Sequence, residues 1–151
     1  MPKKTADLQY YEAIGKRKSA VARVRLYKVA KGQSVSIGQV KAKSGEILVN
    51  QEPITAIFSS HWEKTKYLEP LQLTGCEDKF AISIIVRGGG KHSQLEALVH
   101  GLSRSLEKVD KETFRPVLKK GGFLKRDARV RERRKVGRGG KARRQKQSPK
   151  R

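Results

Sequence analysis

The last 27 residues of the chain, 125–151, contain too little apolar surface to form a core of their own. Fourteen of them are Lys or Arg and only two, Asp127 and Glu132, are acidic, so the segment carries a formal charge of +12. Its apolar side chains are those of Ala128, Val130, Val136 and Ala142. Burying so few groups cannot offset the conformational entropy lost when the segment becomes ordered. We therefore predict that residues 125–151 form an extended basic tail, disordered when free and ordered by a polyanion.

The charge of the whole chain also favours a polyanionic partner, and nucleic acid is the leading one. The 151 residues carry a formal net charge of +22, and a compact body with such a charge repels itself unless a partner neutralises it. No run of about 18 apolar residues is present, so we expect no membrane-spanning helix. Lys3 and Lys4 are not followed by an apolar stretch, so we expect no secretory signal. The single cysteine, Cys76, is predicted to be a reduced intracellular thiol.

The segment before the tail, residues 10–124, is predicted to be one globular domain, preceded by a flexible N-terminus at residues 1–9. Within it, residues 10–29 contain the alternating pattern that is typical of a strand. The apolar face of this strand, which needs a core, is formed by Ala20, Ala22, Val24 and Leu26. The opposite face, which suits contacts with phosphates, is formed by Arg23, Arg25 and Tyr27.

Further strands and a helix are expected in the middle of the domain. Residues 30–45 are rich in Lys, Gly, Ser and Gln, and we expect them to form an extended hairpin loop before a strand resumes at 47–49. A short helix is predicted to be capped by Ser59 or Ser60 and to stop near Pro70, because the residue before a proline disfavours helix. The middle of the domain is therefore expected to contain the strand at 47–49 followed by one short helix.

The second half of the domain carries the clearest periodicity. A core strand is predicted at 80–87, ended by the glycines at 88–90, and the following helix has a buried stripe formed by Leu95, Leu98, Val99, Leu102, Leu106 and Val109. The opposite face of that helix, where we expect a phosphate backbone to approach, is formed by Ser93, Ala97, His100, Arg104 and Lys108. Asp110 is predicted to cap a further helix whose inward residues are Phe114, Val117 and Leu118. Strands followed by helices on one face predict an α+β fold.

We find no motif for catalysis, for a cofactor or for a metal. The glycines at 88–90 follow a strand, but the G-x-x-x-x-G-K-[ST] loop and the dinucleotide fingerprint are absent, so a tight turn against an RNA phosphate is favoured over a nucleotide site. His61, His92 and His100 lack Cys or carboxylate partners at metal-ligand spacing. His92 and Glu96 are four residues apart on a helix, a spacing that more often gives a solvated contact than an acid–base pair.

The basic side chains remain as candidate phosphate ligands. Lys16, Arg17 and Lys18 precede a strand and are suited to point and bidentate contacts with phosphates. In the tail, residues 141–144 place one small residue among three cations, which allows the backbone to approach closely. The tail has no aromatic residue, so it is predicted to contact the backbone and grooves of structured RNA rather than to stack on bases.

Three segments, in the same order and spacing, resemble the family of small-subunit ribosomal protein nine. The first is GKRKSA at 15–20 with ARV at 22–24. The second is GGG at 88–90 followed by SQ at 93–94, Ala97, Gly101 and SRSL at 103–106. The third is RDAR at 126–129 followed by ERRK at 132–135, Gly137 and KARR at 141–144. Together they extend the resemblance from about Tyr10 to the end of the chain.

This resemblance implies an α+β domain of the ribosomal S5 domain-two type, with a left-handed crossover and a long basic C-terminal extension. It implies a non-enzymatic protein of cytoplasmic ribosomes that binds small-subunit ribosomal RNA in the head, beside neighbouring ribosomal proteins. The tail is implied to reach the peptidyl site, where Lys150 and Arg151 contact transfer RNA. With the residues argued above, the predicted ribosomal RNA ligands are Lys16, Arg17, Lys18, Arg23, Arg25, Arg104, Arg126, Arg129, Arg133, Arg134, Lys135, Lys141, Arg143 and Arg144.

Two features depart from the family, and two other functions compete. Members usually end in Ser-Lys-Arg, whereas here Pro149 separates Ser148 from Lys150. Because proline fixes φ and removes a donor, we expect the contact of Ser148 to be displaced, while the terminal Arg151 stays in reach of its transfer RNA contact. Residues 28–45 are longer than the usual loop and are expected to form a lineage-specific hairpin.

Two other functions remain as alternatives. One is a DNA-architectural basic protein. The other is a small-molecule kinase of the same superfold, and a kinase would need a phosphate loop and a metal-binding acid.

Overall fold

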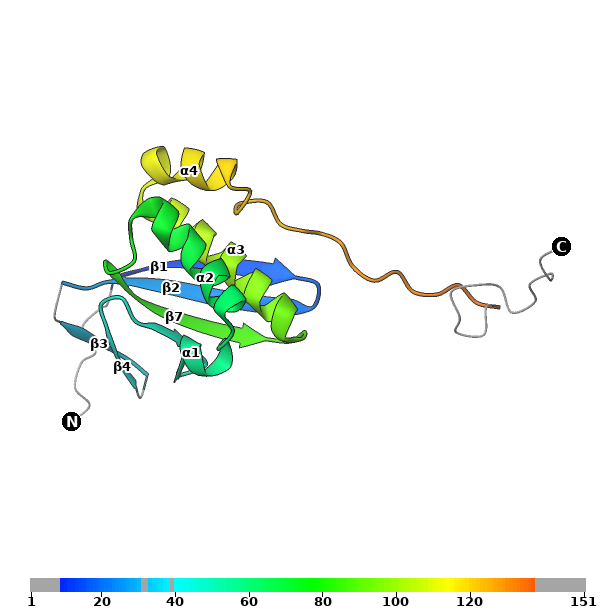
Figure 1. The fold of residues 1–151 in the computed structure, drawn as a ribbon, viewed down its shortest axis with the longest axis horizontal. Helices are drawn as coiled ribbons and strands as arrows, with labels where there is room; N and C mark the ends of the chain where they lie inside the picture. The colour runs from blue at the N-terminus through cyan, green and yellow to red at the C-terminus, as the bar shows by residue number, and fades with distance from the viewer. Residues whose placement is uncertain (1–8, 31–32, 39, 138–151) are drawn as a thin grey trace.

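The computed structural model describes residues 9–30, 33–38 and 40–137 of the chain, shown in colour in Figure 1. Along these residues six strands are followed by two helices, a seventh strand and two more helices. Figure 1 shows the helices packed over a twisted sheet, with the last described residues leading away from it. The architecture is the mixed α+β type that the sequence predicts.

The main sheet has five strands in the order β1, β2, β7, β5, β6. The strands are β1 (Tyr10–Arg17), β2 (Ala20–Lys28), β7 (Phe80–Arg87), β5 (Ile47–Val49) and β6 (Glu52–Pro53). Neighbours pair antiparallel except β5 and β7, which are parallel and therefore need a crossover connection between them. The central strands β2 and β7 are paired over eight residues each, from Val21 opposite Arg87 to Lys28 opposite Phe80.

The strand predicted within residues 10–29 is present as β2, and the structure adds a second strand, β1, before it. The chain reverses at Lys18 and Ser19, which places Arg17 directly opposite Ala20. Lys18 adopts a left-handed φ of 49°, although no glycine or proline marks the turn. The predicted alternation within β2 is nevertheless confirmed, because its alanines, Val24 and Leu26 are fully buried.

The described residues contain four helices, two before β7 and two after it. They are α1 (Ile54–Ile57), α2 (His61–Thr74), α3 (Lys91–Val109) and α4 (Lys111–Lys120). Ser60, rather than Ser59, caps α2 in a reciprocal capping box with Glu63. The prediction that this helix stops near Pro70 is wrong: α2 continues for one more turn to Thr74 and is followed by the C-cap Gly75, which has a left-handed φ of 60°.

The core lies between the sheet and α3. The predicted leucines of α3 are buried, with Val99 and Val109 partly buried beside them, and they pack on the inward side chains of β2 and β7. Cys76 is a buried free thiol at the edge of this core.

The predicted phosphate-facing side of α3 instead packs against β1, so that prediction is wrong for its first half. Ala97 is fully buried, and a Cβ added to Gly15 would lie 1.9 Å from the carbonyl oxygen of Ala97 and 2.3 Å from the nitrogen of Gly101. Only a residue without a side chain fits where the strand and helix backbones touch. Small residues on this helical face therefore admit a strand, not RNA.

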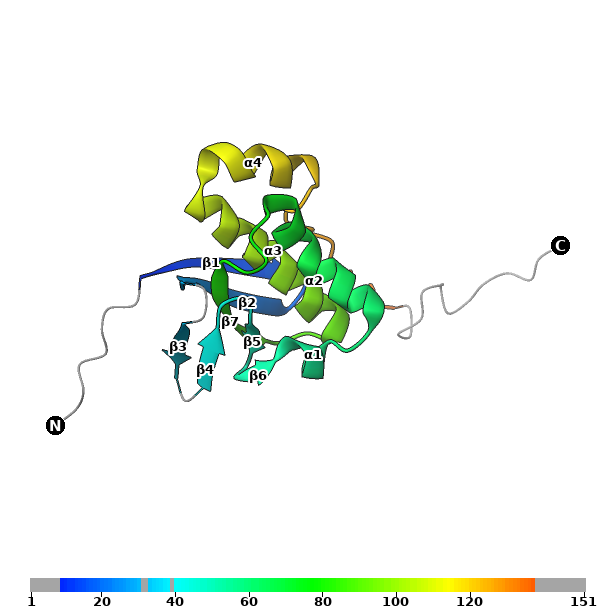
Figure 2. The same ribbon diagram turned by 60° about the vertical axis from the view of Figure 1, so that its left-hand side comes forward.

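The predicted hairpin in residues 30–45 is present and covers part of the helix-free face of the sheet. It consists of β3 (Ser34–Ile37) and β4 (Val40–Lys43), which pair antiparallel. Figure 2 shows this hairpin on the side of the sheet away from α2, α3 and α4. It forms a second small core around Tyr27, so the prediction that Tyr27 belongs to a phosphate-facing surface is wrong.

The last helix begins as the sequence predicts. The carboxylate of Asp110 accepts hydrogen bonds from the backbone N–H groups of Glu112 and Thr113. Leu118 is fully buried and Phe114 partly buried, but Val117 stays 39% exposed, so only part of the predicted inward face is buried.

Replacing Gly15 with alanine is expected to lower the free energy of unfolding by about 1–3 kcal/mol or more, because the new methyl group meets backbone atoms that cannot move aside. Urea unfolding followed by far-ultraviolet circular dichroism measures this loss. Gly90→Ala is the matched control, since an added Cβ there has no neighbour within 4 Å. Equal destabilisation by both substitutions would contradict the proposed backbone contact.

Candidate nucleic-acid interface

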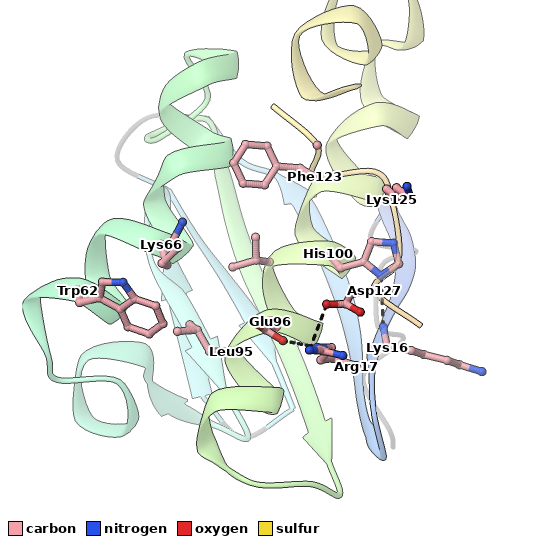
Figure 3. Close-up of a pocket in the computed structure, with 12 residues that line it drawn as sticks. Lys16, Arg17, Trp62, Lys66, Leu95, Glu96, His100, Phe123, Lys125 and Asp127 are labelled. Carbon is pink, nitrogen blue, oxygen red and sulfur yellow. Dashed lines mark hydrogen bonds and ion pairs between the residues drawn. The ribbon is translucent and has the colours of Figure 1, made fainter. Parts of the chain in front are cut away.

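The guanidinium of Arg17 joins three separate parts of the chain at the end of β1. Its Nε donates to Glu96 on α3, its Nη2 lies 3.1 Å from Oδ2 of Asp127, and its Nη1 donates to the carbonyl oxygen of Arg129 at 2.8 Å. The Arg17 side chain is only 10% exposed. Figure 3 shows Glu96 and Asp127 converging on it. Arg17 therefore anchors Asp127 and Arg129 of the tail to the body. Residues 121–129, which lead from the end of the last helix into the tail, are called the root of the tail.

Asp127 is held in its charged form by this arrangement. Hydrogen bonds from the side chain and backbone N–H of Arg129 lower the pKa of Asp127 well below its usual value, and the nearby charge of Arg17 adds to the effect. The same contacts raise the pKa of Arg129. Two of the predicted RNA ligands, Arg17 and Arg129, thus have internal partners.

Arg104 and Lys108, on the second half of α3, contact the exposed edge of β1. The Arg104 Nη1 donates to the carbonyl oxygen of Ile14 at 2.6 Å, and the Lys108 Nζ donates to that of Glu12 at 2.7 Å. β1 is an edge strand, so these carbonyl groups have no strand beyond them to bond. The predicted ligand Arg104 therefore uses part of its guanidinium within the fold.

The histidines form no acid–base site in the described part of the chain. His92 Nδ1 is 3.9 Å from Glu96, whose other carboxylate oxygen is taken by Arg17. His100 accepts a hydrogen bond from the backbone N–H of Lys16 at 3.4 Å, and burial lowers its pKa, helped by Arg104. Within the described residues no group of three or more His, Cys, Asp or Glu is arranged to hold a metal ion. None of the described helices has the length and apolar character needed to cross a bilayer.

The helix-free face of the sheet carries the strand cations. Arg23 and Arg25 are partly exposed there; Arg25 Nε donates to Glu12 at 2.6 Å and its guanidinium lies 4.5 Å from the centre of the Tyr10 ring. The hydrogen bond to Glu12 raises the pKa of Arg25. Arg87, on β7 opposite Val21, lies on the same face, and sequence reasoning missed it although it continues the alternation of a predicted strand.

The remaining predicted ligands are solvent-exposed or lie outside the described residues. Lys16 and Lys18 are exposed at the β1–β2 turn, and residues 130–137 are exposed with no helix or strand. The exposed tail cations among the predicted ligands are Arg126, Arg129, Arg133, Arg134 and Lys135. The predicted ligands that lie outside the described residues are Lys141, Arg143, Arg144, Lys150 and Arg151.

The turn and the root of the tail therefore form one basic end of the molecule. Sequence reasoning found the cations on both segments but missed their contact, because Arg17 and Arg129 are 112 residues apart and no local pattern links them. A family model described as ribosomal protein S9/S16 matches residues 15–151. The match starts at Gly15, the glycine at the contact between β1 and α3, and it includes the tail.

Replacing Arg17 with alanine is expected to free the root of the tail, because Glu96 and Asp127 then lose the cation between them. Limited trypsin digestion followed by mass spectrometry should show cleavage after Lys125 accelerating about tenfold, the effect of losing hydrogen bonds to charged groups. Arg87→Ala is the control, since it removes the same charge from a side chain that has no partner among the described residues. Similar digestion rates for both variants would show that Arg17 does not anchor the tail.

Proposed function

The chain belongs to the ribosomal protein S9/S16 family, and we propose that it is a structural, non-enzymatic component of the small ribosomal subunit that binds ribosomal RNA in the head. The match of the family model to residues 15–151 carries this proposal, because it includes both the folded domain and the basic tail. The ribosome in the cytoplasm is then its site of action, and neighbouring small-subunit proteins are its protein partners.

In this proposal the folded body positions the protein on the RNA, and the tail supplies most of its positive charge. Exposed Lys16 and Lys18 are available for phosphate contacts near the anchored root of the tail, and partly exposed Arg23 is available on the helix-free face of the sheet. Arg17 and Arg104 have internal partners, so their phosphate contacts would use the donors that remain. Phosphate contacts fix the register and orientation of a protein on nucleic acid, which suits a body with cations on a rigid sheet.

The tail neutralises phosphates where RNA helices pack closely, and its tip contacts transfer RNA in the peptidyl site. Support comes from the charge of +12 in residues 125–151, from the absence of aromatic side chains there, and from the family to which the chain belongs. Lys150 and Arg151 are the proposed transfer RNA contacts.

Binding to folded ribosomal RNA is expected to weaken steeply with salt. If about six phosphates are neutralised, the plot of log affinity against log salt concentration has a slope of about −4 to −5. Filter binding of the full chain across a salt series measures the slope. A slope near zero would contradict the mechanism, and equal affinity for duplex DNA at matched salt would favour a DNA-architectural protein.

Deleting Lys150 and Arg151 should leave assembly of the small subunit intact but speed the dissociation of transfer RNA from the peptidyl site. Dissociation rates from reconstituted subunits measure this effect. The double variant Lys119→Ala, Lys120→Ala is the control, because it removes the same two charges from exposed positions on α4. Unchanged dissociation from the shortened protein would refute the role of the tip.

A further inference from the structure

We propose that a groove between α2 and α3 binds one unpaired nucleotide of RNA, with its base against the indole of Trp62. The groove encloses about 230 Å³ and is bounded on its far side by the root of the tail. This inference rests on the proposed function as an RNA-binding protein and adds a site that reads a base, where the tail contacts only backbone. Figure 3 shows the side chains that line the groove.

The floor of the groove is apolar and ends at a half-exposed aromatic ring. Leu95 and Val99 of α3 are among its lining residues, and Figure 3 shows Phe123 and Trp62 on different sides of Leu95. The Trp62 side chain is held by His92, whose ring lies 5.4 Å away at an interplanar angle of 79°. Trp62 is nevertheless 50% exposed, which leaves a large apolar surface in water next to an open groove.

The rim of the groove is cationic. Lys66 and Lys125 lie around it, while the two carboxylates that also line it, Glu96 and Asp127, are both paired with Arg17. Lys66 is 3.5 Å from Glu69, but both side chains are more than 40% exposed, so this ion pair contributes little and leaves the ammonium available. The groove therefore favours a ligand that is anionic and also has an apolar, flat part.

An unpaired nucleotide has both the negative charge and the flat apolar part that the groove favours. Its base has a π-face that stacks on an aromatic ring, and its phosphate pairs with a lysine at the rim. A base inside a duplex is already stacked and cannot enter. An acidic peptide would pair with the lysines but would leave the indole without a stacking partner, so the RNA strand is the occupant that the geometry favours.

The groove also connects the body to the tail. Its far wall is formed by Gly122, Phe123, Lys125 and Asp127, which follow α4 directly. The backbone N–H of Phe123 donates to the carbonyl oxygen of Leu118, so the wall is fixed by the end of the helix as well as by Arg17. A strand whose base lies in the groove would therefore continue along the exposed cations of the tail.

Trp62 is the only tryptophan of the chain, so its fluorescence reports on this groove directly. We would titrate the full chain with a short single-stranded oligoadenylate and with an RNA duplex of equal phosphate count, measuring binding by the anisotropy of labelled RNA. The expected result is that the single strand quenches Trp62 with the same concentration dependence as its binding, while the duplex binds without quenching. Binding of both RNAs without quenching, or equal quenching by both, would overturn the proposal.

Substitutions test the same point without relying on fluorescence. Trp62→Ala should weaken binding of the single strand about five- to a hundredfold, the usual effect of removing one stacking ring, and Trp62→Phe should retain most of the affinity. Leu73→Ala is the control, as it shortens another half-exposed apolar side chain of α2 that does not line the groove. Lys66→Ala should weaken binding more than Lys64→Ala, which removes an exposed lysine outside the groove.

The outcomes separate this inference from the proposed function. Equal effects of Trp62→Ala and Leu73→Ala, with RNA still bound, would overturn the groove and leave the proposed function standing. A full chain that binds neither RNA would contradict the proposed function, and the groove with it.

Discussion

The contact between the backbones of β1 and α3 sets the geometry on which the rest of the molecule depends. Gly15 lies against Ala97, and this contact brings Arg17, two residues after the glycine, beside Glu96, one residue before the alanine. The same alignment places Arg104 of the helix next to the carbonyl groups at the edge of β1. A steric fit between two small residues therefore determines which charged side chains meet.

Three acidic side chains pair with arginines within the fold. Glu96 and Asp127 surround Arg17, and Glu12 pairs with Arg25 on the helix-free face. Each of these pairs fixes the direction of an arginine or of the chain that follows it. At the basic end Asp127 also pairs with Arg129, and Glu132 pairs with Lys135, but cations outnumber acids there, which is the condition for attraction of a polyanion.

Local patterns in the sequence predict the parts of the fold that local physics determines. The apolar stripe at 95–106 gives a buried helix because its period matches the helical repeat. The turn at Lys18 was not predicted because it contains no glycine or proline. The helix α2 continues past Pro70 because its end is determined by Gly75, which adopts a left-handed conformation. For the candidate site, the sequence showed which segments are basic, but the pairing of Arg17 with Asp127 joins positions far apart in the chain and only the fold reveals it. The groove at Trp62 was not predicted for the same reason, because its lining residues come from four separate segments of the chain.

The two edges of the main sheet are both unsuited to pairing with another chain. At one edge, side chains of α3 occupy carbonyl groups of β1; at the other, β6 has only two residues and one of them is Pro53, which has no N–H to donate. Sheet edges without such protection invite strand-to-strand aggregation. A strand from another copy of this protein therefore finds few free backbone groups at either edge of the main sheet.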